Sequence, residues 1–385
     1  MRIETDHDNL RAAIEWSAGD ATARELRLCA ALAHFWCQRS YLDEGRQRLS
    51  GALERGSAAP TREQAVALDW ASCKELLRFD RARAREQCEE AVAVARAVGD
   101  GRVLACAMRH LGTIEWAEDG STFAVRDALV AALAAAREAD YPREVGYTLS
   151  WLGRVVQDLG DEAASLALEA EGRRILREVG DRDALGANLA MSGENALVRG
   201  NHAAARAPLE ESLVVWREMG NVAGETQALL GLGDLARAEG DLSIAHARYA
   251  EALRVGRANG ARSFLRPVTR VLLRLASVNS AAGDPRRAAR IFGAEAAARG
   301  NMTMFQGRRD QWEDDLAAAR ATLGEAAFEA AWAEGRAMRL EEAIRMPWKW
   351  KRYGLVPMSQ AANPVKQFDR TAAPSSVLHP SASFP

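Results

Sequence analysis

The fold is decided by residues 160–201, which read GDEAASLALEAEGRRILREVGDRDALGANLAMSGENALVRGN. A glycine opens this stretch, another divides it and a third stands one residue from its end, at intervals of twenty residues. Each glycine is followed by Asp or Asn. Because glycine adopts the left-handed conformation after a helix and Asp or Asn caps the next one, each mark predicts a helix end followed by a helix start. The stretch therefore predicts two helices.

The marks continue on both sides of this stretch. In chain order they are Gly120, Gly160, Gly180, Gly200, Gly220, Gly240 and Gly260. Between marks, apolar residues recur at intervals of three and four, as Leu229, Leu232 and Leu235 do, which places them on one helix face. Each interval of twenty predicts one helix of about 15 residues, and two antiparallel helices make a forty-residue unit.

Small residues recur inside the helices as well. Gly153, Gly193 and Gly233 stand at the same place in successive first helices. A glycine within a helix costs about 1 kcal/mol relative to alanine, so its periodic return predicts a site where two helices cross closely. Glu169 and Gly172 replace the expected large and small residues of one second helix, where we expect loose packing. A three-residue insertion moves the next mark to Gly283-Asp284.

The composition is that of an ordinary globular chain. Its 385 residues are 48% hydrophobic and 27% charged, with a formal net charge of −2. No stretch reaches the roughly 18 uninterrupted apolar residues that a membrane span needs, and the first residues are not a secretory signal. We expect a cytoplasmic protein without a membrane span.

Local motifs for chemistry are missing. Only four lysines occur, Lys74, Lys349, Lys351 and Lys366, and none follows a glycine, which excludes a P-loop. The five cysteines contain no C-x-x-C pair and the six histidines no H-E-x-x-H motif. We therefore expect no enzymatic activity, no cofactor and no metal, and the near-zero net charge predicts no direct binding to nucleic acid.

The repeat unit resembles the tetratricopeptide repeat in a forty-residue form. The residues that carry this resemblance are Trp151-Leu152-Gly153 and Leu232-Gly233 in the first helices, and Ala245, Tyr249 and Ala252 in a second helix. The resemblance implies an all-α fold, a right-handed superhelix (α-solenoid) of antiparallel helix pairs.

Both ends of the repeat region carry a second resemblance. Residues 7–16 (HDNLRAAIEW), 283–294 (GDPRRAARIFGA) and 323–343 are similar to the opening and closing parts of the helical-repeat half of large bacterial transcriptional regulators. These are the LuxR-like and antibiotic-regulatory-protein-like regulators with a signal-transduction ATPase core. The resemblance covers roughly residues 6–344, and it implies a sensing and docking half, without the ATPase or the DNA reader.

We expect four regions. They are N-terminal entry helices with a first helical pair (1–60), repeats (61–300), a C-terminal helical cap (301–344) and a disordered tail (345–385). The tail prediction follows from six of the eleven prolines, which fall in the last 39 residues. The abrupt change at Arg345 also suggests the hypothesis that the chain is part of a larger regulator gene that was split or frame-shifted.

The tetratricopeptide resemblance also implies a site. In such repeats the first helices line a concave groove, and partner contacts lie just after the helix glycine and one turn before it. The corresponding positions here are Arg109, Thr113, Trp116, Ser150, Arg154, Gln157, Asp158, Glu194, Leu197, Asp234 and Arg237. The alternative is that these side chains simply form the solvated face of amphipathic helices.

The leading functional hypothesis is a non-enzymatic scaffold or sensor module in transcriptional regulation or signalling. It would bind a partner protein or peptide in the groove, such as a regulator or ATPase encoded nearby. A small-molecule sensor module of a transcriptional regulator is the alternative, and an enzyme assembled from distant residues is the third. The sequence identifies neither the partner nor the oligomeric state.

Overall fold

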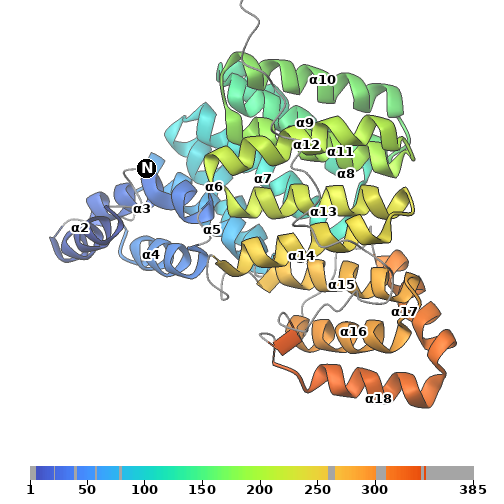
Figure 1. The fold of residues 1–385 in the computed structure, drawn as a ribbon. Coiled ribbons are helices and arrows are strands. Elements are labelled where there is room, and N and C mark those ends of the chain that lie inside the picture. The colour runs from blue at the N-terminus through green and yellow to red at the C-terminus, as the bar shows by residue number, and fades with distance from the viewer. Residues whose placement is uncertain are drawn as a thin grey trace, which may run out of the picture. The chain divides into compact units, whose positions relative to one another are not determined.

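The computed structural model describes residues 6–20, 22–38, 41–56, 59–77, 80–258, 265–300, 309–339 and 342–343. Every regular element within these ranges is an α-helix (Figure 1). The all-α prediction is therefore confirmed. The expected tail, residues 345–385, lies outside the described residues.

Helices alternate between two classes along the array. The first helices are α5 (Arg62–Leu77), α7 (Gly101–Asp119), α9 (Pro142–Asp158), α11 (Arg182–Val198), α13 (Val222–Ala238) and α15 (Leu265–Ala281). The second helices are α6 (Arg81–Val98), α8 (Phe123–Glu138), α10 (Glu162–Glu178), α12 (His202–Met219), α14 (Leu242–Ala258) and α16 (Pro285–Arg299). Before them come α2 (His7–Asp20), α3 (Thr22–Gln38) and α4 (Leu42–Glu54), and after them α17 (Arg309–Leu323) and α18 (Glu325–Arg336).

The glycine marks form the helix junctions. Gly180 has a φ of 70°. The N–H of Asp181 donates to the carbonyl of Leu176 (3.1 Å), which closes α10, and the Asp181 carboxylate accepts from the N–H of Ala184 (2.9 Å), which caps α11. Positive φ recurs at Gly160, Gly200, Gly220 and Gly240.

The shifted mark after Gly260 also falls where we expected it. Gly283 has a φ of 82°, and the carboxylate of Asp284 caps α16 by accepting from the N–H of Arg287. Gly260 itself lies outside the described residues.

Glycines inside the first helices lie at helix crossings. A Cβ atom on Gly193 would lie 2.5 Å from Cγ of Leu209, and one on Gly233 would collide with the ring of Tyr249. Leu209 and Tyr249 are fully buried in the facing second helices. The glycines therefore let each helix pair approach to native packing density, as their period predicted.

The expected loose packing around Glu169 is wrong. A Cβ on Gly172 would lie 2.8 Å from the carbonyl oxygen of Gly146, so the backbones of α9 and α10 approach closely. Glu169 is only 2% exposed, and its carboxylate accepts hydrogen bonds from Ser192 Oγ and Asn195 Nδ2, both at 2.7 Å. A hydrogen-bonded polar network around Glu169 thus replaces the apolar contact at this crossing.

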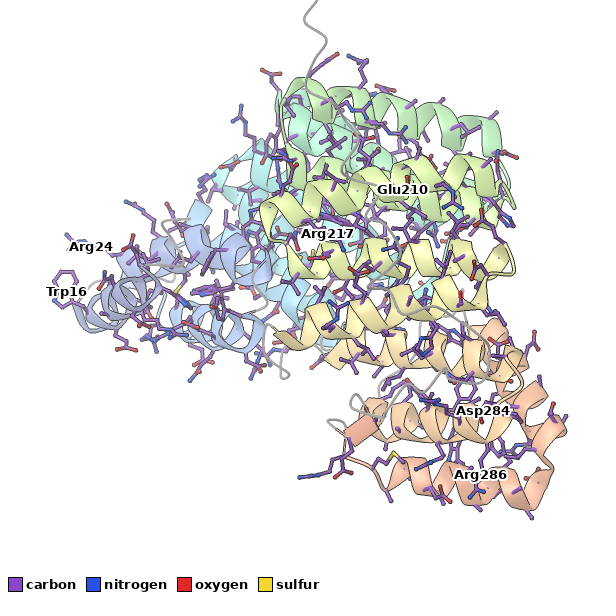
Figure 2. All side chains as sticks on the ribbon, viewed as in Figure 1. Trp16, Arg24, Glu210, Arg217, Asp284 and Arg286 are labelled. Carbon is purple, nitrogen blue, oxygen red and sulfur yellow. The ribbon has the colours of Figure 1, made fainter. Side chains whose placement is uncertain are left out.

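The helix pairs stack one beside the next (Figure 1). Each first helix contacts the next first helix, and each second helix contacts the first helices before and after it. A ladder of ion pairs with a forty-residue period joins successive second helices, and Arg217 of its last rung is labelled in Figure 2. The rungs are Arg137–Glu171 (3.3 Å), Arg177–Glu211 (2.7 Å) and Arg217–Glu251 (2.6 Å).

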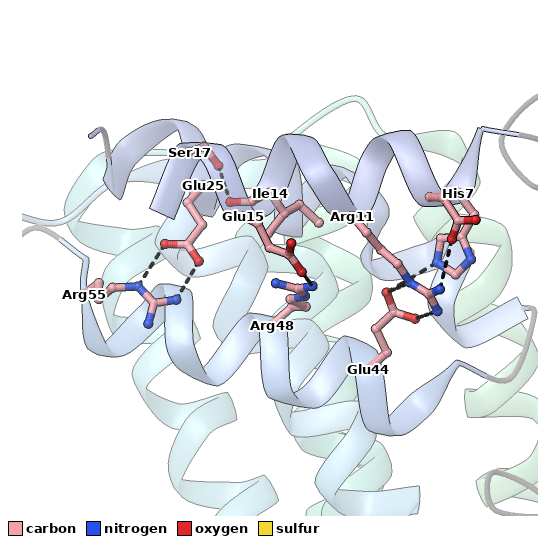
Figure 3. Close-up of polar contacts among 10 residues, drawn as sticks. His7, Arg11, Ile14, Glu15, Ser17, Glu25, Glu44, Arg48 and Arg55 are labelled. Atoms are coloured by element: carbon pink, nitrogen blue, oxygen red, sulfur yellow. Dashed lines mark hydrogen bonds and ion pairs between the residues drawn. The ribbon is translucent and has the colours of Figure 1, made fainter. Parts of the chain in front are cut away.

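Ion pairs tie the N-terminal helices together (Figure 3). Arg55 donates two hydrogen bonds, of 3.0 and 2.6 Å, to the carboxylate of buried Glu25, and Arg11 pairs with Glu44 at 2.6 Å. The hydrogen bond from Arg11 lowers the pKa of Glu44 below its ordinary value. Beneath these pairs lies an apolar cluster that includes Ile14, Leu26, Trp36 and Leu49.

Among the described helices, none combines the length and apolar character needed to cross a membrane.

Candidate functional site

The predicted contact residues lie on α7, α9, α11 and α13, each of which is a first helix. We call the surface that carries them the first-helix face. Their side chains, however, are largely engaged with one another and with neighbouring repeats. All six charged members have a partner of opposite charge within the chain: Arg109, Arg154, Asp158, Glu194, Asp234 and Arg237.

Arg109 is buried within a chain of four polar side chains. Its Nε donates to Glu144 of α9, and its Nη2 lies 3.0 Å from Nε2 of His110. The other imidazole nitrogen of His110, Nδ1, lies 2.6 Å from Asp69 of α5. A guanidinium can only donate, so in this arrangement Arg109 donates to Nε2 of His110, and Nδ1 of His110 donates to Asp69.

Burial and this polar chain shift the pKa values of Glu144 and of the neighbouring Cys106. Burial opposes the ionised form of Glu144, but Arg109 holds the pKa of that carboxyl below its ordinary value. Burial, then the Glu144 carboxylate, raise the pKa of the Cys106 thiol well above its usual range. Cys106 therefore stays protonated and donates to Glu144 at 3.3 Å, so it is not a thiolate nucleophile.

A second polar group joins the C-terminal ends of α7, α9 and α11. The indole N–H of Trp116 donates to Ser121 Oγ (3.0 Å), which in turn donates to Asp158 (2.6 Å). Arg154 lies 3.5 Å from Asp158 and 3.6 Å from Glu194. The guanidinium of Arg154 also lies over the ring of Trp116, 5.8 Å from its centroid. The structure thus brings these five residues together, four of them predicted.

At the C-terminal end of the array, predicted residues of the first-helix face contact later helices of the same chain. Asp234 accepts two 2.8 Å hydrogen bonds from Arg274 of α15 and one from the hydroxyl of Tyr249 (2.7 Å). Arg237 lies 3.6 Å from Asp315 of α17. Arg237, the last predicted contact residue, is therefore already in contact with α17 of the same chain.

The remaining predicted residues are mostly internal too. Thr113 is 6% exposed and Ser150 1% exposed, and each hydroxyl donates to a backbone carbonyl of its own helix. Gln157 accepts from Arg199 at 2.7 Å, and Leu197 is half-buried. Thr113 and Ser150 thus lie inside the array in this conformation and leave little surface for a partner.

A cluster of rings that sequence reasoning missed lies beside Arg109. We call it the ring cluster, and it consists of His34, Trp70, His110 and Tyr147. The imidazole of His34 packs against Trp70 (centroids 5.4 Å apart), and Trp70 lies 6.3 Å from His110. The guanidinium of Arg109 lies over the ring of Tyr147, 4.5 Å from its centroid.

The ring cluster and Asp183, which contacts it, come from α3 and the first helices α5, α7, α9 and α11. His34 Nε2 of α3 lies 3.3 Å from Asp183 Oδ2 of α11, and Asp183 also accepts from Asn221 of α13 at 2.8 Å. All four rings are partly exposed to solvent. Trp70 and His110 stand forty residues apart, so the repeat period in the sequence could have indicated that they lie in successive units. Nothing in the sequence pairs His34 with Asp183.

The described part of the chain contains no metal site. No group of three or more His, Cys, Asp or Glu side chains there is placed to hold a metal ion. A shallow surface hollow lies at the start of α7, lined by Arg62, Asp100 and Arg102 among others. The Asp100 carboxylate already accepts from Arg62 and from two N–H groups of α7, so this hollow is part of a helix cap.

Comparison with known proteins supports the fold. No family model matches the chain, and no curated protein matches it. The crystal structure of Rap protein complexed with Competence and Sporulation Factor matches with a TM-score of 0.51 at 12% identity, covering 83% of this chain and 89% of that one. This similarity, with the helix pairs described above, establishes a tetratricopeptide-like α-solenoid.

Two further solved structures are more distant in shape. A signal transduction ATPase with numerous domains and a tetratricopeptide repeat sensor, from Pyrococcus horikoshii, has a TM-score of 0.47 at 13% identity, and the match covers 82% of this chain and 47% of that one. BtubC from P. vanneervenii has a TM-score of 0.40 at 16% identity, covering 63% of this chain and 94% of that one.

Proposed function

We propose that this chain is a non-enzymatic interaction module that binds a protein or peptide partner through its first-helix face, at the ring cluster. The observation that carries the proposal is the row of His34, Trp70 and His110 from α3, α5 and α7, with Tyr147 of α9 joined to it through Arg109. Aromatic side chains that stay partly exposed are typical anchors of binding surfaces. The Rap protein, which shares this fold, was crystallised with Competence and Sporulation Factor, and this supports the proposal.

The finer proposal is a sensor or docking role in transcriptional regulation or signalling. It is supported by the similarity of residues 7–16 and 283–294 to the helical half of ATPase-coupled regulators. In the structure the first of these segments falls in α2 and the second spans the start of α16. A regulator or ATPase encoded nearby is the partner that this proposal favours, and cytoplasmic location is part of it.

The experiment is affinity capture from the native cell followed by mass spectrometry, with matched variants of the full chain. Trp70→Ala removes the centre of the ring cluster. Trp16→Ala removes a tryptophan of α2 that is 69% exposed and points away from the other helices (Figure 2). We expect a partner captured by the wild type and by Trp16→Ala, and lost with Trp70→Ala.

Loss of the partner with both variants, or with neither, would contradict a site at the ring cluster.

A thermal-shift screen against metabolites tests the alternative function, that of a small-molecule sensor. A small molecule bound by the folded chain raises its melting temperature in proportion to its saturation. Stabilisation by a metabolite, with no captured partner, would replace the proposal by a small-molecule sensor.

A further inference from the structure

The charges on the first-helix face are neutralised from within the chain. Arg109 is paired with Glu144, Arg154 with Asp158 and Glu194. These groups are mostly buried: Arg109 is 4% exposed, Glu144 0% and Glu194 8%. A partner that used a point charge to bind here would have to break an existing buried pair, which is strongly unfavourable.

The imidazole of His110 follows the same pattern. Its Nδ1 hydrogen is used by Asp69, and its Nε2 lone pair is used by Arg109. Neither nitrogen is therefore available to a ligand, although the ring itself remains partly exposed. What His110 offers a partner is the surface of its ring.

Ring surfaces are thus the main recognition elements that the face leaves accessible. Trp70 lies between the imidazoles of His34 and His110, and all three are partly exposed. Tyr147 adds a phenol whose hydroxyl stays protonated, because burial raises the pKa of Tyr147 above its ordinary value. Aromatic surface of this kind binds other aromatic or large apolar side chains, with hydrogen bonding at its edge.

We infer that the partner is a peptide segment of low net charge that anchors on the ring cluster through an aromatic or large apolar side chain. This inference deepens the proposed function and depends on it. Charge complementarity determines which peptide binds here. Because the charges of the first-helix face are already paired within the chain, the face favours a peptide segment without net charge. An acidic peptide would leave its carboxylates desolvated against these rings, and a basic peptide would find the acidic groups of the face, such as Glu144 and Glu194, already paired within the chain.

The test is selection from a random phage-displayed peptide library on the immobilised full chain. We expect the enriched peptides to share an aromatic or large apolar residue and to have low net charge. Their affinity should fall at least about tenfold with Trp70→Ala or Tyr147→Ala, which is the usual effect of truncating an aromatic hot spot. Trp16→Ala should bind as the wild type does.

Salt dependence provides a second readout that does not depend on the variants. Binding through rings should change little between low and high salt, because screening acts on exposed charges.

Trp70→Phe should retain part of the affinity, which separates loss of a ring from loss of the fold. The melting temperature of each variant checks that it is folded.

The possible failures are distinguishable. Enriched peptides with high net charge, whose binding weakens steeply with salt and survives Trp70→Ala, would overturn this inference and leave an interaction module in place. A library from which no peptide is enriched would overturn the inference, and together with empty affinity capture it would also overturn the proposed function.

Discussion

His34 of α3 and Asp183 of α11 lie 3.3 Å apart, although 149 residues separate them in the sequence. In a repeat array each unit normally contacts only its neighbours. Three first helices, α5, α7 and α9, lie between them in the chain, so the row formed by α3 and the first helices bends enough to bring α3 and α11 together. The ring cluster lies where these helices meet.

The His34–Asp183 contact should be weak but measurable. Both side chains are partly exposed, at 41% and 25%, so we expect a coupling of about 0.2–1 kcal/mol. A double-mutant cycle of His34→Ala and Asp183→Ala, followed by urea unfolding, measures it. Strict additivity of the two single variants would show that the two side chains do not interact in solution.

Removing Arg109 should destabilise the chain strongly. Arg109→Ala leaves the buried carboxylate of Glu144 without its cation, which typically costs about 3–5 kcal/mol. Arg177→Ala is the matched control, since it removes an arginine from the exposed ladder and should cost less than about 1 kcal/mol. Equal effects on the urea midpoint would mean that the Arg109 pair is not buried.

Acid should weaken the same pair. Arg109 lowers the pKa of Glu144 in the folded chain, so the unfolded chain binds this proton first as the pH falls. The stabilisation is complete above the ordinary carboxyl value of 4.5 and is lost as the pH falls toward the lowered value. Comparing wild type with Glu144→Gln across this range should show a difference that shrinks with acidification; a constant difference would contradict it.

His246 of α14 predicts a separate pH step. Burial, and then the charge of Arg287, lower the pKa of His246 from 6.5 to about 4. Stability should therefore be complete above pH 6.5 and fall as the pH drops toward about 4, by at most about 3 kcal/mol. His246→Gln should remove this step from melting temperatures measured over that range. A wild-type profile parallel to that of the variant would rule the step out.

Gly193 should not tolerate a larger residue. The side chain of Gly193→Leu would meet Leu209 and the carbonyl of Ala205, so we expect a loss of about 1–3 kcal/mol from overpacking. Adding Leu209→Ala makes room and should restore part of the stability. Melting curves of the single and double variants check this, and a neutral Gly193→Leu would show that no crossing lies there.

The periodic features were the predictable part of this structure. Helix ends at Gly180 and Asp181, and the crossing at Gly193, follow from local backbone preference and from spacing, which the sequence displays directly. Packing around Glu169 did not follow from the repeat pattern, because its partners Ser192 and Asn195 come from the next helix pair. Polar networks of this kind depend on which side chains face each other.

The candidate site was harder to predict for a related reason. Projection from the repeat placed the candidate residues on the first helices but could not show that Arg109 is paired with Glu144. It also missed His34, Trp70 and Tyr147. The approach of α3 to α11 is the sum of small rotations between successive helix pairs, and no single unit encodes that sum.

The polar chain from Asp69 through His110 and Arg109 to Glu144 limits how the molecule can be rebuilt. Repeat proteins are often lengthened or shortened by whole units, since each unit offers its neighbours the same surface. Here α5, α7 and α9 each contribute a different member of one connected set, so these units are not interchangeable. A copy of α7 and α8 inserted between α8 and α9 would place the copied Arg109 beside Glu144, but the original Arg109 would then face the copied α7 and lose its carboxylate partner. Changes in array length should therefore be tolerated better beyond α9 than within this segment.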